Sequence, residues 1–326
     1  MAMTEPWQVL LPPEIDPVGP NALTEFATCT GMDEYDSVDD ALADIDRYDA
    51  VIVRVAPLDA DVLERADRLK VIAKHGSGLD NVDIDAASER DIVVCNTPGV
   101  NARSVAEHAI ALLFGIRRNL HTADRHVREG GWDRGAHCGR ELDGDVLGLM
   151  GFGSIAKETA RLAEGIGQRI IAYDPHHDET VRDGVTRVPT LTDLFERSDA
   201  VSLHVPLTDE TRGAISTAEF DALGPDGVLI NTARGGVIDE DALVEALETE
   251  SIGGAALDTF GSEPLGETHP LCDFDRVLLT PHIGGVTVEA LARMSEGAAA
   301  NVRTVFDGGL PESTVNRASL DAEVTQ

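Results

Sequence analysis

The chain has 326 residues, 42% of them hydrophobic, and is therefore long enough for two domains of roughly 100 to 200 residues with separate cores. No apolar run approaches the roughly 20 residues of a membrane span, and the first residues lack the basic start and apolar stretch of a signal peptide, so we expect a cytoplasmic protein with no membrane partner. The net charge of −33 argues against a nucleic-acid partner. The 59 acidic residues are interspersed along the chain, which indicates a solvated, halophilic-type surface.

Short apolar runs alternate with amphipathic stretches over the first hundred residues. The predicted strands lie at 8–12, 50–54, 70–76 and 92–96. The helical pattern between them is typical of an α/β fold with a largely parallel sheet. Segment 102–130 follows, with apolar residues at intervals of three and four and a stop at Gly130 and Gly131, so we predict one long helix there.

A second α/β series occupies the rest of the chain. Its six predicted strands lie at 145–153, 169–174, 199–206, 227–235, 252–260 and 277–282. Six strands fit a doubly wound dinucleotide-binding sheet. The segment from Thr287 is again helical but too short for a domain, so we expect it to pack on an earlier part of the chain. The order predicts two α/β domains with a cleft between them.

Residues 147–174, LGLMGFGSIAKETARLAEGIGQRIIAYD, place a glycine-rich turn between a predicted strand and a predicted helix. The pattern requires a tight turn at Gly151, close approach of a pyrophosphate at Gly153, and close helix packing at Ala156. The N–H groups expected to face the phosphates are those of Ser154, Ile155 and Ala156. Asp174 ends the next strand and can accept hydrogen bonds from the adenosine ribose. An ordinary glycine turn is the alternative, but the surrounding pattern favours NAD as cofactor.

Four blocks resemble the D-isomer-specific 2-hydroxyacid dehydrogenase family, from about residue 50 to about residue 310. They are HGSGLDNVDIDAASERDIVVCNTPGVNARSVAEHAIALL, the glycine-rich stretch, VSLHVPLTDETRGAISTAEFDALGPDGVLINTARGGVIDEDAL, and ALDTFGSEPL followed by LLTPHIGGVT. The resemblance implies two Rossmann-like domains: a flavodoxin-like substrate-binding domain at 1–99 and 287–326, and a doubly wound NAD-binding domain at 100–286. It also implies a phosphoglycerate dehydrogenase-like short form without a regulatory extension, and a homodimer built around 102–130.

The resemblance places three catalytic residues on Arg234, Glu263 and His282. The guanidinium of Arg234 can bind the carboxylate and the carbonyl oxygen of a 2-oxo acid together. His282 would donate a proton to the carbonyl oxygen during reduction and accept one during oxidation. Glu263 would pair with the other ring nitrogen, fixing the tautomer and favouring the imidazolium. Singly, each could be an ordinary surface or structural residue, but their motifs and order favour catalysis.

Further positions follow from the same resemblance. Residues implied to line the nicotinamide and its ribose are Val205, Thr232, Ala233, Asp258 and Gly284, with Asp258 accepting from the carboxamide. The backbone amides of Ser77 and Gly78 are implied to bind the substrate carboxylate, in a loop shaped by Asp80 and Asn81. We expect His204 to be structural and His176 and His177 to be solvated. The four cysteines form no C-x-x-C pair, so no metal site is expected.

The substrate follows least directly from the sequence. Arg54, Lys74 and Arg134 stand where phosphoglycerate dehydrogenases tend to carry basic residues, whereas Ser154 stands where those enzymes commonly have arginine. We therefore favour an anionic 2-hydroxy or 2-oxo acid, with 3-phosphoglycerate first and glyoxylate or hydroxypyruvate reduction as the alternative. A protein that binds NAD(H) as a signal is an alternative of another class. The formate dehydrogenase branch fits poorly because it has no use for Glu263.

Overall fold

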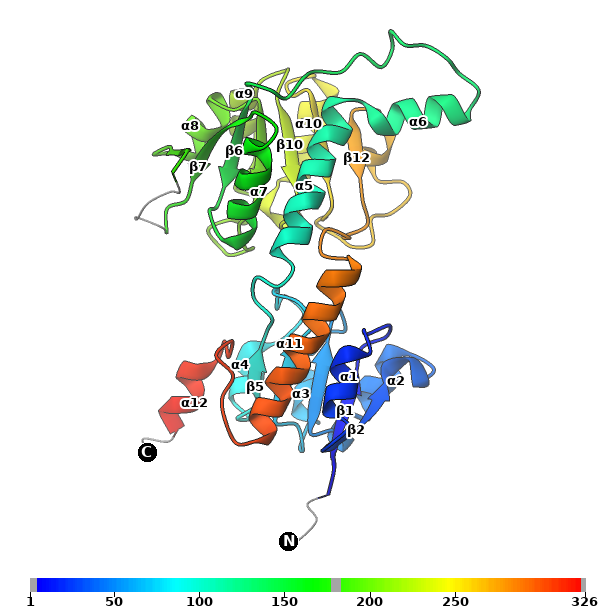
Figure 1. Cartoon of the computed structure of the whole chain (residues 1–326), viewed down its shortest axis with the longest axis vertical. Coiled ribbons are helices and arrows are strands. Elements are labelled where there is room, and N and C mark those ends of the chain that lie inside the picture. The colour runs from blue at the N-terminus through cyan, green and yellow to red at the C-terminus, as the bar shows by residue number, and fades with distance from the viewer. Residues whose placement is uncertain (1–4, 177–182, 324–326) are drawn as a thin grey trace. The chain divides into compact units, whose positions relative to one another are not determined.

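A computed structural model describes residues 5–176 and 183–323 of the chain (Figure 1). The chain divides into two compact units. Described residues up to Asn101 and from Thr287 onward form the first unit, and those within Ala102–Val286 form the second. Parallel sheets carry both units, which confirms the expected α/β fold class. In the described ranges, no helix combines the length and the apolar character needed to cross a membrane.

The first unit is built on a five-stranded parallel sheet. Its strands are β1 (Trp7–Leu11), β2 (Ala27–Gly31), β3 (Ala50–Val53), β4 (Val71–Lys74) and β5 (Val93–Cys95). They lie in the order β2-β1-β3-β4-β5, and every neighbouring pair is parallel. This is the strand order of flavodoxin-like sheets. The sequence did not predict β2, because ATCTG is an edge strand without a run of large apolar residues.

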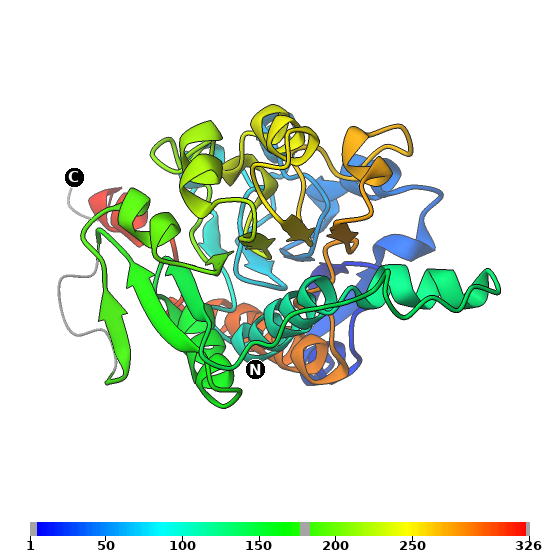
Figure 2. The same ribbon diagram turned by 90° about the horizontal axis from the view of Figure 1, so that it is seen from above.

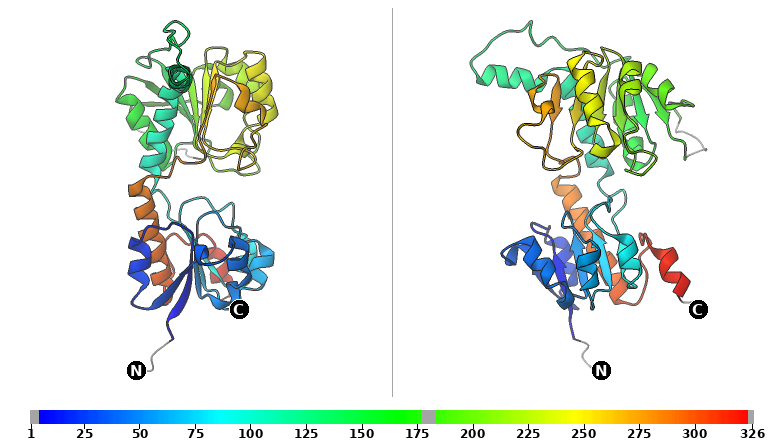
Figure 3. Two further views of the ribbon diagram at one scale, coloured as in Figure 1. Left: turned by 90° about the vertical axis from the view of Figure 1, so that its right-hand side faces the viewer. Right: turned by 180° about the vertical axis from the view of Figure 1, so that it is seen from behind.

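Helices cover both faces of this sheet (Figure 3). They are α1 (Val18–Leu23), α2 (Val38–Ala43), α3 (Ala60–Glu64), α4 (Ile84–Ser88), α11 (Val288–Phe306) and α12 (Arg317–Glu323), with short turns η1 (Met32–Glu34) and η2 (Ile45–Arg47). The predicted helical segment after Thr287 is α11, whose first turn is capped by the Thr287 hydroxyl accepting from Ala290 N at 3.1 Å. Helix α11 packs on α1 and β4, so this segment joins the first unit as expected.

The second unit is built on a seven-stranded parallel sheet. Its strands are β6 (Val146–Met150), β7 (Arg169–Tyr173), β8 (Val185–Arg187), β9 (Ala200–Leu203), β10 (Val228–Asn231), β11 (Gly254–Leu257) and β12 (Val277–Leu279). The order is β12-β11-β10-β9-β6-β7-β8, which is doubly wound with its reversal between β6 and β9. The predicted count of six strands was one short, because the edge strand β8 has only three residues, VTR.

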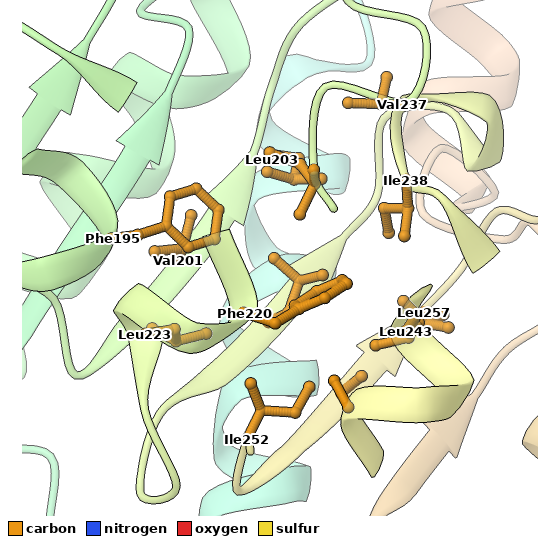
Figure 4. Close-up of a cluster of buried hydrophobic side chains, with 14 of the residues drawn as sticks. Phe195, Val201, Leu203, Phe220, Leu223, Val237, Ile238, Leu243, Ile252 and Leu257 are labelled. Carbon is orange, nitrogen blue, oxygen red and sulfur yellow. The ribbon is translucent and has the colours of Figure 1, made fainter. Parts of the chain in front are cut away.

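Helices cover both faces of this sheet (Figure 2), and two apolar cores lie between the sheet and the helices. On one face lie α5 (Ala102–Arg117) and α7 (Ser154–Glu164), and on the other α8 (Leu191–Glu196), α9 (Thr217–Leu223) and α10 (Glu240–Glu248); turns η3 (Gly235–Val237) and η4 (Pro270–Asp273) complete the unit. Phe195 of α8 and Phe220 of α9 lie in the core on the second of these faces, together with Leu203 and Leu257 (Figure 4). This packing fixes the strands whose ends carry the candidate site.

The predicted long helix over 102–130 is wrong in one respect, because it is broken. Helix α5 ends at Arg117, and α6 (Leu120–Arg128) begins after Asn119, which has a left-handed backbone (φ +51°). Asparagine adopts this conformation more readily than most residues. The buried Arg117 donates to the backbone oxygens of Asp199 and Asp226, which ties the end of α5 to the sheet. Helix α6 then projects from the body of the unit (Figure 1).

Candidate active site

All predicted catalytic and cofactor residues follow the carboxyl ends of strands in the second unit. Gly151 follows β6, Val205 follows β9 and Arg234 follows β10, while Glu263 follows β11 and His282 follows β12. Because the strands are parallel, these ends share one edge of the sheet. Ligands of open α/β sheets bind outside this edge, beside the reversal of strand order.

The glycine-rich turn has room for a ligand at the start of α7. Gly151 has φ +85°, and a Cβ there would lie 2.7 Å from the backbone oxygen of His204, so a side chain is excluded. At Gly153 an added Cβ would meet no described atom within 4 Å. Ala156 is fully buried, as close packing of α7 on the sheet requires. The open space at Gly153 lies where the first N–H groups of α7, from Ser154 and Ile155 onward, have no partner within the helix.

Asp174 closes the same turn from the end of β7. Its Oδ2 accepts from Phe152 N at 2.8 Å and its Oδ1 from His176 N at 3.0 Å. Each carboxylate oxygen can accept more than one hydrogen bond, so the predicted contact with a ribose is compatible with these bonds. The side chain of His176 is 72% exposed. His177 lies outside the described residues.

Arg234 is held by a side chain of the strand that precedes it. Asn231 is fully buried, donates from Nδ2 to Arg234 O at 2.9 Å, and accepts from Ala233 N at 2.9 Å. The next residue, Gly235, allows the turn to lie against another loop, because a Cβ there would fall 1.9 Å from the backbone carbon of Phe260. The turn that carries Arg234 therefore packs directly on the loop that carries Glu263.

Glu263 and His282 form a hydrogen-bonded pair. His282 Nδ1 lies 2.8 Å from Glu263 Oε2, and Glu263 Oε1 accepts from Phe260 N at 3.1 Å. A carboxylate only accepts, so Nδ1 carries the proton and the neutral ring has its lone pair on Nε2. The two side chains are 49% and 38% exposed, which leaves Nε2 accessible to a ligand. The pair can hold and transfer a proton at His282 Nε2.

The turn that carries His282 has a strained backbone. His282 has φ +53°, a left-handed conformation that is uncommon for a residue other than glycine. The carboxylate of Asp258 holds the turn by accepting from Ile283 N and Gly284 N, each at 2.8 Å. Thr280 Oγ1 donates to the same carboxylate at 2.6 Å. Asp258 thus fixes the backbone directly after His282 and binds the Thr280 side chain before it.

Asp258 keeps its negative charge although only 1% of its surface is exposed. Burial alone would raise the pKa of its carboxyl group, but hydrogen bonds from the His108 side chain, Thr280 and the backbone of Ile283 and Gly284 hold that pKa below its ordinary value. His108 Nε2 on α5 lies 3.3 Å from Asp258 Oδ1 and 3.1 Å from Thr280 Oγ1. Sequence reasoning found Asp258 but missed this role and missed His108, because no motif joins segments so far apart. A contact of Asp258 with a carboxamide stays a prediction.

The remaining predicted cofactor residues lie close to the same strand ends. Thr232 is 9% exposed, and within the described part of the chain its buried Oγ1 has no hydrogen-bond partner. Such an atom needs a partner, and a bound ligand can supply one. His204 follows β9 with its Nε2 3.0 Å from Ser202 Oγ, and burial lowers the pKa of His204 to about 4. The ring is therefore neutral near pH 7, in line with the structural role predicted for it. The open space at Gly153 and the unpartnered Thr232 hydroxyl both fit a dinucleotide.

The predicted substrate residues lie in the first unit. Lys74 Nζ is buried and donates to Arg54 O at 2.6 Å and to Asn81 Oδ1, while Asn81 Nδ2 donates to Ala56 O. Lys74 therefore supports the loop by joining β4 to the residues after β3, a role that sequence reasoning did not assign. Among the described residues, the N–H groups of Ser77 and Gly78 and the guanidinium of Arg54 have no partner. Those groups can bind an anion. In residues 5–176 and 183–323, no cluster of three or more His, Cys, Asp or Glu side chains is placed to hold a metal ion.

Comparison with known proteins identifies the class that this fold and site define. The NAD binding domain of the D-isomer specific 2-hydroxyacid dehydrogenases matches residues 110–284. The D-3-phosphoglycerate dehydrogenase of Synechocystis is 37% identical over 325 residues, which cover 98% of this chain. The hydroxypyruvate reductase of Thermotoga maritima is 42% identical over 259 residues, which cover 78% of this chain and 84% of that protein. The chain belongs to the D-isomer specific 2-hydroxyacid dehydrogenase family, as the sequence motifs predicted.

A solved structure agrees with this placement. The NADPH-dependent glyoxylate/hydroxypyruvate reductase of Sinorhizobium meliloti, solved with NADP and malonate, has a TM-score of 0.84 at 34% identity, with 96% of this chain and 97% of that chain covered. This chain spans only 58% of the length of the Synechocystis enzyme, whereas its match to the Sinorhizobium reductase covers 97% of that chain.

Proposed function

We propose that the protein is an NAD-dependent D-2-hydroxyacid dehydrogenase that interconverts a small 2-hydroxy acid and its 2-oxo acid. The observation that carries this proposal is the Glu263–His282 pair, with Nε2 accessible, on the same sheet edge as Arg234. The open space at Gly153 and the unpartnered Thr232 hydroxyl support NAD(H) as the cofactor. Bound NAD(H) supplies or accepts the hydride at C2.

The side chains of this chain supply binding and proton transfer. The Arg234 guanidinium binds the carboxylate and the C2 oxygen together, which fixes the orientation of the acid. His282 Nε2 donates a proton to that oxygen during reduction and accepts one during oxidation. Glu263 keeps the Nδ1 proton in place and stabilises the charged ring. Asp258 contributes by holding the His282 turn in its left-handed conformation.

For the substrate we propose 3-phosphoglycerate first. The similarity of 98% of this chain to part of a D-3-phosphoglycerate dehydrogenase and the unpartnered cation of Arg54 favour it. Glyoxylate or hydroxypyruvate is the second candidate, because reductases of these acids are as similar in sequence and Lys74 is committed to its own loop. In the first unit, the N–H groups of Ser77 and Gly78 are proposed to bind the carboxylate of the acid.

Steady-state kinetics of purified protein with NAD(H) test the reaction and the substrate together. We expect turnover of 3-phosphoglycerate with a KM that rises at least about tenfold in Arg54→Ala, as the loss of one charged hydrogen bond implies, whereas KM for glyoxylate stays unchanged. Arg65→Ala, which removes an exposed arginine that donates to the backbone oxygen of Asp61, is the control. Equal effects of Arg54→Ala on both acids would reject phosphoglycerate. Tight NADH binding without turnover of any acid would favour the NAD(H)-sensing alternative.

We also propose that the protein is a homodimer assembled through α6 and the segment after it. Leu120, Val127 and Trp132 are 54%, 53% and 79% exposed there. Residues 118–140 contain five arginines and three acidic residues, although acidic residues outnumber basic ones in the whole chain. An exposed apolar strip with basic neighbours fits the acidic surface of a second copy. Arg134 lies in this segment and is proposed to reach the active site of that copy.

A further inference from the structure

The loop that carries Glu263 has little regular structure of its own. It joins β11 to β12, contains only the short turn η4 (Pro270–Asp273), and is exposed from Gly261 to Pro264. A glutamate in such a loop keeps a fixed distance to His282 only if the loop itself is held. The internal bond from Phe260 N to Glu263 Oε1 shapes the tip but does not attach it to the sheet.

Glu240, at the first position of α10, attaches this loop on both sides of Glu263. Its Oε1 accepts from Gly261 N at 2.7 Å, and its Oε2 lies 3.6 Å from His269 Nε2. His269 Nδ1 accepts from Leu271 N at 3.3 Å, so in the neutral ring the proton is on Nε2 and faces Glu240. A single carboxylate therefore contacts the loop two residues before Glu263 and six residues after it.

The same contact joins the Glu263 loop to the Arg234 turn. Glu240 follows η3, which begins directly after Arg234, and α10 is fixed by Asp239 accepting from Ala242 N at 3.1 Å. Gly235 leaves no space between this segment and Phe260, since an added Cβ would lie 2.2 Å from Phe260 O. The hydrogen bond from Gly261 to Glu240 thus holds two backbones together that carry Arg234 and Glu263.

We propose that Glu240 is a positioning residue that keeps Glu263 in hydrogen-bonding reach of His282 and in register with Arg234. The inference rests on the proposed function, because it assigns Glu240 a kinetic effect exerted through Glu263. Glu240 touches neither His282 nor the arginine side chain in the described contacts, and its side chain is 23% exposed. Its effect on turnover is therefore indirect.

The test compares full-length variants by kcat/KM, NADH dissociation constant and Tm. Glu240→Ala should lower kcat/KM by about tenfold to a hundredfold, the range expected for a misplaced reacting group, with the NADH dissociation constant unchanged. Glu240→Asp, one methylene shorter, should do the same, whereas Glu240→Gln should lose less than either variant, because its amide oxygen still accepts from Gly261 N although its NH2 group cannot accept from His269 Nε2. Glu245→Ala, an exposed position on the same helix, is the control. Normal kcat/KM in both Glu240→Ala and Glu240→Asp would overturn the inference.

A double-mutant cycle with Glu263→Gln separates this role from a general structural effect. If Glu240 acts through Glu263, Glu240→Ala should cost little more than about twofold in kcat/KM in the Glu263→Gln background. Fully additive losses would overturn the inference and leave the proposed function intact. Full activity of Glu263→Gln alone would instead reject the proposed function. The cycle compares kcat/KM between variants, so each variant must fold. Glu240→Asp replaces Glu240→Ala if the alanine variant fails to fold.

Discussion

His282 combines an accessible Nε2 with a backbone conformation that is unfavourable on its own. A left-handed residue other than glycine costs of order 1–3 kcal/mol and persists only where the surroundings determine it. The buried carboxylate of Asp258 provides that determination through two successive backbone N–H groups. The strain at His282 is thus an observed feature of the candidate proton donor, and its support comes from a residue that need not touch the substrate.

Replacing His282 or Arg234 by alanine should remove most turnover. Loss of general acid–base help alone is worth about a hundredfold to ten-thousandfold, and loss of Arg234 removes the group that orients the acid. The NADH dissociation constant, measured by fluorescence titration, should change little in both variants. A His282→Ala protein with near-normal kcat would contradict the assignment of the proton donor.

Asp174 should make the protein prefer NAD(H) over NADP(H). Its carboxylate closes the glycine-rich turn and would repel a phosphate on the adenosine ribose. We expect a higher kcat/KM with NADH than with NADPH, and Asp174→Asn, which removes the charge but keeps an oxygen acceptor, should narrow the difference. The structurally similar glyoxylate/hydroxypyruvate reductase of Sinorhizobium meliloti is named as NADPH-dependent. Similarity of fold therefore does not decide the cofactor, and the preference has to be measured. A wild-type preference for NADPH would show that this role of Asp174 is wrong.

At the scale of elements, the sequence predicted what buried apolar runs and motifs encode. The runs at 50–54 and 227–235 became β3 and β10, and the order of the motifs around Arg234, Glu263 and His282 placed all three at strand ends. The edge strands β2 and β8 were missed because they lack such runs. Glu240 and His108 were missed for another reason. Their partners lie 21 and 172 residues away, and single-sequence patterns do not encode contacts at such separations.

The element that projects from the second unit should mediate dimer formation. Helix α6 exposes Leu120 and Val127, and Trp132 follows in the next segment. Sedimentation at micromolar concentration in high salt should give a dimer, and Val127→Asp combined with Trp132→Ser should give a monomer, because both changes remove apolar area from the proposed contact. Val18→Asp, at an exposed apolar site on α1, is the control. Monomeric wild-type protein under these conditions would reject the dimer.

At the scale of the whole molecule, like charges should make stability depend on salt. With 59 acidic against 26 basic residues, repulsion opposes the folded state in dilute buffer. The screening length falls from roughly 30 Å at 0.01 M to about 3 Å at 1 M ionic strength. Melting curves across potassium chloride concentrations should show Tm rising over this range. Exposed ion pairs such as Arg47–Asp44 weaken in salt, but they contribute little.

Sucrose provides the control for that measurement. It stabilises folded proteins by exclusion from the surface and leaves electrostatic screening unchanged. The rise of Tm with potassium chloride should therefore exceed the rise with sucrose at matched osmolality, most of all below 1 M ionic strength. A Tm that stays flat or falls with potassium chloride would contradict a salt-adapted surface.

The division of the chain into two units bears on how such enzymes diversify. Arg234, Glu263 and His282, with the residues that hold them, are all encoded between Ala102 and Val286. If the first unit binds the acid as proposed, substitutions there should alter the preferred acid without disturbing the proton-transfer pair. Relatives named for different acids, a D-3-phosphoglycerate dehydrogenase, a glyoxylate reductase and a hydroxypyruvate reductase, are 37%, 41% and 42% identical to this chain. Substrate choice in this family should evolve, and be engineered, chiefly through the segment that precedes α5.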